Sequence, residues 1–259
     1  SGADVSNYSV TDQSSTTANI TAKALTVSGI TASSKTYDGS VTATMNGNSA
    51  VYSGLVSGDT FTGSYSGVFA NANVGTGKTV TITSSYSGAD VSNYSVTNQS
   101  STTADISTKT LTASASTANK TYDGATTAST TLTFTGLVGT ETLGQTVGST
   151  FDNKNVGSNK TVTVNSITLA DGTNGGLAAN YSISAGQTTT ANITAKSLTV
   201  SGITASNKIY DGNTVATLDP TSVTYSGLVS GDSFAGSYSG LFSDKNIGTG
   251  KTVTISSSY

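Results

Sequence analysis

The stretch KTVTITSS, residues 78–85, places valine and isoleucine at alternate positions with threonines between them. Successive side chains of a β-strand point to opposite faces, so this alternation predicts a strand with one buried and one solvated face. The pattern returns as KTVTVNS at 160–166 and as KTVTISS at 251–257, and no stretch has the 3.6-residue periodicity of a helix. The sequence therefore predicts an all-β protein made of repeated units.

Three landmarks recur with a period of about 86 residues: the tyrosines of YDG (37, 122 and 210), those of NYS (8, 94 and 181), and the lysines that close TANITAK-like segments (23, 109 and 196). This period suits a small β-sandwich domain and is too long for one coil of a solenoid. We predict tandem Ig-like antiparallel β-sandwich domains arranged as an elongated rod. Residues 1–23 are the C-terminal strands of a split repeat, 24–109 and 110–196 are complete repeats, and 197–259 are the N-terminal part of a third.

Short segments with the same alternation predict further side chains that point toward the core of each unit. Apolar residues expected to face the core are Val80 and Ile82, Val162 and Val164, Val253 and Ile255, Tyr8 and Val10, Ala18 and Ile20, and Leu25 and Val27.

The motif KTYDG, with KIYDG in the third copy, is predicted to be a structural corner. Asp-Gly is a favoured central pair for a tight turn in which both residues have positive φ, and the tyrosine can bury its ring against the end of its domain. The predicted turn residues are Tyr37, Asp38 and Gly39; Tyr122, Asp123 and Gly124; and Tyr210, Asp211 and Gly212.

An alternative function for the acidic residues is calcium binding, because carboxylate oxygens suit that ion. One carboxylate per motif is few for a dication, and the spacing of a calcium loop is missing, so we favour the structural turn. The loops FANANVG, FDNKNVG and FSDKNIG are likewise predicted to be Asx-turns. The calcium candidates are Asp38, Asp123, Asp211, Asp152 and Asp244, and the Asn or Asp positions of the loops are 71, 73, 152, 153, 155, 244 and 246.

The composition excludes several classes of function. Charged residues make up 10% of the chain, the net charge is −3, and there is no histidine, cysteine, tryptophan or arginine. The chain therefore has no residues for a nucleophilic triad or for a common zinc site, and it has no basic surface that would bind nucleic acid. No apolar run approaches the ~20 residues of a membrane helix, so membrane insertion is not expected.

We expect no enzyme, since Glu141 is the only glutamate and no pair of carboxylates recurs. One covalent possibility is an isopeptide crosslink from a lysine to an asparagine, promoted by a buried aspartate. Its candidate lysines precede the YDG motifs, at Lys35, Lys120 and Lys208.

The fixed order of KTYDG, YSGLVSGDSF, FDNKNVGSNKTVTV, NYSI and TANITAKSLTV resembles the YDG repeats of large bacterial surface adhesins. These are filamentous-haemagglutinin-like proteins of the two-partner secretion type, and the resemblance covers essentially the whole chain. It implies a tandem array of Ig-like domains forming an extracellular stalk on a bacterial cell surface or in its matrix. The family implies no catalytic residues, and calcium between domains stays possible.

Three functions follow as hypotheses. The first is a non-catalytic spacer in cell adhesion or biofilm, whose partners are neighbouring repeats. The second is a head-to-tail fibre in which residues 1–23 of one molecule complete the domain begun at 197 in another, because 1–11 repeats 87–97 while 250–259 matches 77–86. The third is weak binding of extracellular polysaccharide, through the threonines 79, 81 and 83 and the tyrosines 52, 65, 225 and 238.

Overall fold

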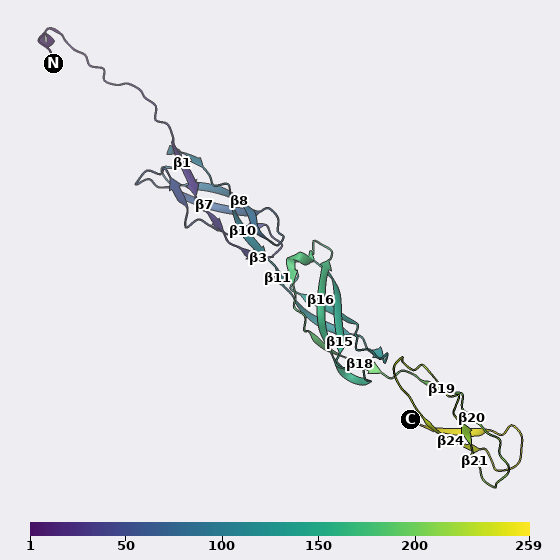
Figure 1. The fold of residues 1–259 in the computed structure, drawn as a ribbon. Coiled ribbons are helices and arrows are strands. Elements are labelled where there is room, and N and C mark those ends of the chain that lie inside the picture. The colour runs from purple at the N-terminus through teal and green to yellow at the C-terminus, as the bar shows by residue number, and fades with distance from the viewer. The chain divides into compact units, whose positions relative to one another are not determined.

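The computed structural model describes all residues, 1–259, and divides into two compact units. Unit 1 comprises residues 1–110 and 179–182, and unit 2 comprises residues 111–178 and 183–259. Both are built from strands, and the only helical elements are three short 3-10 turns (Figure 1). The all-β prediction is confirmed. None of the helical turns has the length and apolar character of a membrane-spanning helix.

Unit 1 contains two larger sheets, with strand orders β6-β1-β9 and β3-β10-β8-β7-β4, and the pairs β2-β5 and β11-β17. Figure 1 shows β7, β8 and β10 lying together. The elements are η1 (Val5–Asn7), β1 (Lys23–Ser28), β2 (Thr31–Ala32), β3 (Lys35–Thr36), β4 (Thr42–Ala43), β5 (Met45–Asn46), β6 (Val51–Ser53), β7 (Thr62–Phe69), β8 (Gly75–Ser87), η2 (Val91–Asn93), β9 (Tyr94–Thr97), β10 (Ser101–Ser107), β11 (Lys109–Thr110) and β17 (Tyr181–Ser182), which follows η3 (Ala178–Asn180).

Unit 2 contains the sheets β13-β18-β16-β15 and β21-β24-β25 and the pairs β12-β14, β19-β23 and β20-β22. Its strands are β12 (Thr112–Thr117), β13 (Lys120–Thr121), β14 (Thr130–Thr135), β15 (Leu143–Phe151), β16 (Gly157–Asp171), β18 (Thr188–Thr194), β19 (Thr199–Ser201), β20 (Thr204–Ala205), β21 (Val215–Ala216), β22 (Leu218–Asp219), β23 (Thr224–Ser226), β24 (Ser237–Phe242) and β25 (Val253–Ser258).

The sheets are mixed, whereas the sequence suggested antiparallel strands throughout. β1 pairs in parallel with β9, and β10 pairs in parallel with β3. The second repeat has the same parallel pairings, β11 with β17 and β13 with β18. A parallel pair needs a long connection, and each of these pairs joins the start of a repeat to its end, so almost the whole repeat supplies that connection.

The core follows the predicted alternation in the first two repeats. Val80 and Ile82 of β8 are buried, as are Leu25 and Val27 of β1. The threonines on either side of Val80, at 79 and 81, face solvent. In the second repeat Phe151, Val162, Ala191 and Ile193 form one buried cluster, which Tyr122 and Ala128 contact. Burying one such aliphatic side chain contributes about 1.5–3 kcal/mol.

Two groups of predicted core residues are not fully buried. Tyr8, Val10 and Ile20 lie on the surface of residues 8–22, which form no strand. Ala18 is exposed as well. The inward prediction is therefore wrong for this segment, because an alternating pattern buries a side chain only where a partner sheet covers it.

In the third repeat Val253 is half-buried and Ile255 is exposed. Their equivalents in the first two repeats are buried. The prediction that these two residues face a core is thus met only in part.

Two closely similar segments in different surroundings give a matched test of the core. Ile106 of β10 is buried, whereas Ile20, in the same motif, is fully exposed. We expect Ile106→Ala to destabilise the first repeat by about 2–5 kcal/mol through lost burial and a residual cavity. Ile20→Ala at low protein concentration is expected to leave that repeat's stability unchanged. Hydrogen exchange in urea, read by mass spectrometry on peptides from β8 and β10, measures both, and equal effects of the two variants would contradict this description of the core.

Candidate functional site

The lysine of the YDG motif is held by a ring of oxygen acceptors. In the second repeat Lys120 Nζ donates to Asp123 Oδ1 at 2.8 Å, to the Ala125 carbonyl at 2.7 Å and to the Thr127 carbonyl at 3.0 Å. It also lies 5.5 Å from the centroid of the Phe151 ring, within the range of a cation–π contact. An ammonium group has three donors, and all three are used here.

The same arrangement recurs in the other repeats. Lys35 binds Asp38 and the carbonyls of Ser40 and Thr42 over the Phe69 ring, and Lys208 binds Asp211, Asn213 and the Val215 carbonyl over the Phe242 ring.

The aspartate of the motif forms an Asx-turn. Asp123 Oδ1 accepts from the backbone N–H of Ala125 at 2.9 Å as well as from Lys120. Only the glycine that follows lies in the left-handed region, with φ of 76° at Gly39, 80° at Gly124 and 81° at Gly212. The predicted turn with both residues at positive φ is therefore wrong. The aspartate keeps an ordinary backbone because its side chain must reach the N–H two residues ahead.

A second lysine in each repeat was not singled out from the sequence. Lys160, which starts the KTVTVNS segment, is 9% exposed and lies 2.8 Å from Asp152 Oδ1 and 2.7 Å from Asn153 Oδ1. Its equivalents are Lys78, which donates to Asn71 Oδ1, and Lys251, which donates to Asp244 and to the Asn246 carbonyl. The signal was present, because a lysine precedes TVT in all three copies.

The loop before that lysine contains the predicted Asx-turns. Side-chain oxygens of residues 71, 153 and 244 accept from the backbone N–H groups of residues 73, 155 and 246. The two lysines of each repeat thus each brace one turn.

The geometry does not fit calcium at the candidate aspartates. Each of the five carboxylates has an ammonium group as its hydrogen-bonded partner, so a dication would have to displace a lysine. The structure contains no group of three or more acidic, histidine or cysteine side chains that could hold a metal ion.

The crosslink candidates differ among the repeats. Lys208 Nζ lies 2.9 Å from Asn213 Oδ1, beside Asp211, whereas residues 40 and 125 at the equivalent position of the other motifs are Ser and Ala. An amine must be neutral to attack an amide, but the carboxylate and the aromatic ring both stabilise the charged form. The arrangement is that of an ion pair.

The tyrosine of YDG contacts residues that belong to a different repeat in the sequence. Within unit 1 the rings of Tyr37 and Tyr181 meet edge to face, with centroids 5.4 Å apart. Asn180 beside them is 1% exposed; its Oδ1 accepts from the Val74 N–H at 2.9 Å and its Nδ2 donates to Asn73 at 3.1 Å. Apart from its place in NYS, no pattern in the sequence predicts that this asparagine is buried.

Within unit 2 the Tyr122 hydroxyl donates to Asp232 Oδ2 at 2.8 Å, and Lys154 Nζ lies 3.5 Å from the other carboxylate oxygen. The hydrogen bond to Asp232 raises the pKa of Tyr122, since losing the proton would place a second negative charge beside the carboxylate. The Tyr122 ring packs against the core cluster of its own repeat, as predicted, and its hydroxyl binds the SGD segment of another repeat.

The tyrosines considered for sugar stacking are engaged in aromatic clusters. The Tyr52 and Tyr65 hydroxyls are 2.9 Å apart, and those of Tyr225 and Tyr238 are 2.8 Å apart. The hydrogen bond with Tyr225 raises the pKa of Tyr238 to about 12. Phenylalanines pack edge-on against one ring of each pair, Phe61 on Tyr52 at 5.2 Å and Phe234 on Tyr225 at 5.1 Å. Stacking on a sugar stays a prediction.

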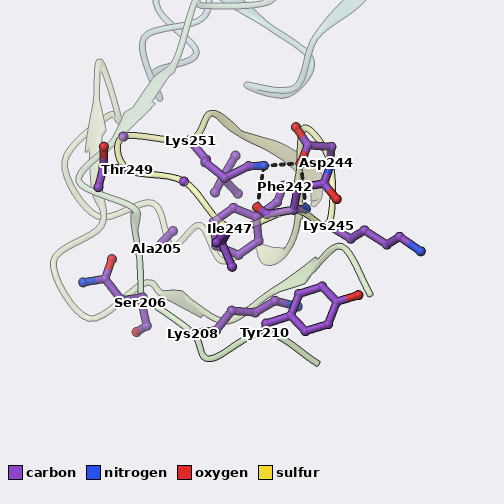
Figure 2. A pocket seen from close by; sticks show the side chains of 15 residues that line it. Ala205, Ser206, Lys208, Tyr210, Phe242, Asp244, Lys245, Ile247, Thr249 and Lys251 are labelled. Carbon is purple, nitrogen blue, oxygen red and sulfur yellow. Dashed lines mark hydrogen bonds and ion pairs between the residues drawn. The ribbon is translucent and has the colours of Figure 1, made fainter. Parts of the chain in front are cut away.

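One cleft of about 560 Å³ lies in the third repeat (Figure 2). Lys208 and Tyr210 line one side, and Lys251 lies on the other, turned toward Asp244. Phe242 and Val253 contribute the apolar part of the lining. The cleft thus lies between the third KxYDG motif and the third KTVT segment.

Comparison with known protein families gives three matches to the YDG domain, at residues 21–104, 107–191 and 194–259. Each begins three residues before the corresponding boundary predicted from the sequence. No curated protein and no solved structure matches the chain.

The lysine–aspartate pair predicts a loss of stability in acid. The hydrogen bond from Lys120 holds the pKa of Asp123 below its ordinary value of 3.8 in the folded protein. The folded state therefore binds fewer protons than the unfolded state, so the stabilisation is complete above about pH 5 and is lost as the pH falls through the lowered pKa. Asp123→Asn should flatten the acid part of the curve of unfolding free energy against pH. Asp12→Asn, in the exposed N-terminal segment, is the control, and an unchanged slope in Asp123→Asn would contradict the proposed role.

Intact mass tests the crosslink. Because the lysines are ion-paired, we expect the purified chain to have the mass of its sequence, 25.7 kDa. A deficit of one ammonia that disappears in Lys208→Gln would show instead that a bond has formed to Asn213.

Proposed function

The chain belongs to the YDG domain family, which matches it three times in tandem, and from this premise we propose that it is a non-catalytic structural spacer. The proposed setting is the stalk of an extracellular bacterial adhesin that acts in cell adhesion or in a biofilm matrix. The observation that carries the proposal is that the recurring charged residues bind one another and the backbone of their own turn. In all three copies the YDG lysine and aspartate bind each other and nearby backbone, which is the behaviour of scaffold residues.

The short connections between repeats support a spacer of limited flexibility. Only Thr108 separates β10 from β11, and the next residue after β11 is Leu111, which is buried. Four residues separate β18 from β19. A connection of this length lacks the independent reach of a Gly/Ser linker.

The lysine and aspartate of the YDG motif also argue against catalysis at that motif. A reactive amine or carboxylate needs a pKa near the working pH, but the carboxyl pKa values of Asp123 and Asp211 are lowered by their lysine partners. Such groups stay charged at neutral pH and hold the turn together.

Small-angle scattering of dilute chain 1–259 tests the spacer. Strands rise about 3.3 Å per residue, so each domain should be roughly 30–40 Å long, and three domains in line should give a maximum dimension on the order of 100 Å. A compact particle of the same mass would contradict the proposal. A glycan array run on the same sample separates the alternatives, because a signal lost in Tyr65→Ala would favour a binding module over a spacer.

A further inference from the structure

Two pairs of tyrosines place their hydroxyl groups in direct contact. The hydroxyl oxygens of Tyr52 and Tyr65 are 2.9 Å apart, and those of Tyr225 and Tyr238 are 2.8 Å apart. The members of each pair are 13 residues apart in the sequence, and all four side chains are half-buried. A contact between two phenols thus recurs at the same place in the first and third repeats.

Each pair connects two separate sheets. Tyr52 lies on β6, in the sheet β6-β1-β9, whereas Tyr65 lies on β7, in the sheet β3-β10-β8-β7-β4. Tyr225 lies on β23, which pairs with β19, whereas Tyr238 lies on β24, in the sheet β21-β24-β25. The chain has no cysteine, so a disulfide cannot join these sheets. A covalent bond between the two rings of a pair would join them.

The backbone beside each pair holds the hydroxyls in place. The Gly63 N–H donates to the Tyr52 hydroxyl at 3.1 Å. A Cβ at Gly63 would overlap the Tyr65 hydroxyl and would lie 2.8 Å from the Tyr52 oxygen, and a Cβ at Gly236 would lie 2.7 Å from the Tyr238 oxygen. The glycine therefore lets the backbone pass directly beside the hydroxyls, which leaves the rings little freedom to separate.

The contact between hydroxyls brings reactive ring positions together. A phenol that loses one electron and its proton becomes a phenoxyl radical, in which the oxygen and the ortho and para carbons share the unpaired electron. Each ortho carbon is bonded to the carbon that carries the hydroxyl, so rings in hydroxyl contact also have neighbouring ortho carbons. Two radicals held in this way meet without diffusing, as in an intramolecular reaction.

We propose that Tyr52 with Tyr65, and Tyr225 with Tyr238, are sites of oxidative crosslinking to dityrosine. The oxidant is a haem peroxidase working with hydrogen peroxide. Each phenol loses one electron and its proton, a carbon–carbon bond forms between two ortho carbons, and the hydrogens of those carbons move to the oxygens and restore both phenols. One molecule of hydrogen peroxide takes up the two electrons and two protons and becomes two molecules of water, so the protein loses two hydrogen atoms.

The second repeat provides an internal comparison, because it lacks the pair. Phe134 occupies the position of Tyr52, two residues before the glycine of GLV. Val147 occupies the position of Tyr65, four residues before the phenylalanine that ends the strand. Neither side chain is a phenol, so the same fold without the two hydroxyls should give no crosslink at this place.

The crosslink would close a loop of 13 residues and tie one sheet of the repeat to the other. Closing a loop lowers the conformational entropy of the unfolded chain, so the crosslinked repeat should need a higher urea concentration to unfold. The inference concerns a modification of the chain, goes beyond the spacer function and stands or falls separately from it.

Peptide mass spectrometry of dilute folded chain 1–259, treated with a haem peroxidase and hydrogen peroxide, tests the proposal. Cleavage after lysine and before aspartate separates the members of each pair, because Asp59 and Asp232 lie between them. We expect peptide 38–58 to remain joined to 59–78, and 219–231 to 232–243, each with the summed mass less two hydrogen atoms. The same treatment in concentrated urea, where the rings are not held together, should give neither product.

Tyr65→Phe should abolish the joined product of the first repeat and leave that of the third unchanged. The variant keeps the Tyr52 hydroxyl, which binds the Gly63 N–H, so it is expected to fold as the parent does. Tyr86→Phe is the matched control. The Tyr86 hydroxyl donates to Asn98 and not to a tyrosine, so this variant should crosslink like the parent.

Two outcomes would overturn the inference. The first is that the folded chain gives no joined peptides although Tyr8, which is 74% exposed, is consumed by the same oxidant. The second is that the joined peptides form equally in urea or persist in Tyr65→Phe. Neither outcome bears on the length of the particle in scattering, which tests the spacer.

Discussion

Each complete repeat depends on one strand insertion. β10 and β18 come late in their repeats, yet they lie between a segment from the beginning of the repeat and the long strand that starts at Gly75 or Gly157. Their alanine and isoleucine cover the hydrophobic cluster, and their backbone pairs with both neighbours.

The YDG lysine connects the sheet of its repeat to the YDG turn. From the edge strand β13, its ammonium group reaches the Asx-turn carboxylate and two backbone carbonyls within residues 123–127, and it lies over the Phe151 ring, so one side chain ties the turn to β15. The backbone carbonyls near 125 and 127 would otherwise need water. A lysine suits the task because its three donors diverge from a point, whereas the planar fork of arginine would not match this trigonal set of acceptors.

Local patterns predicted the strands well and the pairings poorly. The alternation in KTVTITSS correctly placed Val80 and Ile82 in the core, because that strand is covered on one face. The identical logic failed at Ile20, since burial there depends on a partner surface that no short pattern describes. The parallel pairing of β1 with β9 was missed for a related reason, as alternation specifies a face and leaves strand direction open.

The YDG motif shows the same limit: its local sequence predicts a reversal of the chain, but not the type of turn or the distant contacts of its tyrosine. Asp-Gly indicated a reversal, but the aspartate keeps an ordinary backbone because its carboxylate accepts both from the N–H two residues ahead and from the lysine three residues earlier. The contacts of Tyr122 with Asp232 and of Tyr37 with Tyr181 join residues more than a hundred positions apart. A hydroxyl and a carboxylate at such separation carry no local signature, so only the folded arrangement identifies them.

The late position of the inserted strand also bears on how such a chain folds. A repeat emerging from a ribosome or a translocon must wait for its last residues before its sheet is complete, and meanwhile its open edge meets the equivalent strands of neighbouring copies. Closely similar neighbours are prone to exchange these strands. Here the middle copy differs most, with TGLVGTETLGQTVGST where the outer copies have SGLVSGDTFTGSYSG and SGLVSGDSFAGSYSG. This difference lies outside the inserted strands STTADIS and TTTANIT, which remain closely alike, so exchange of these strands between copies stays a hazard of folding.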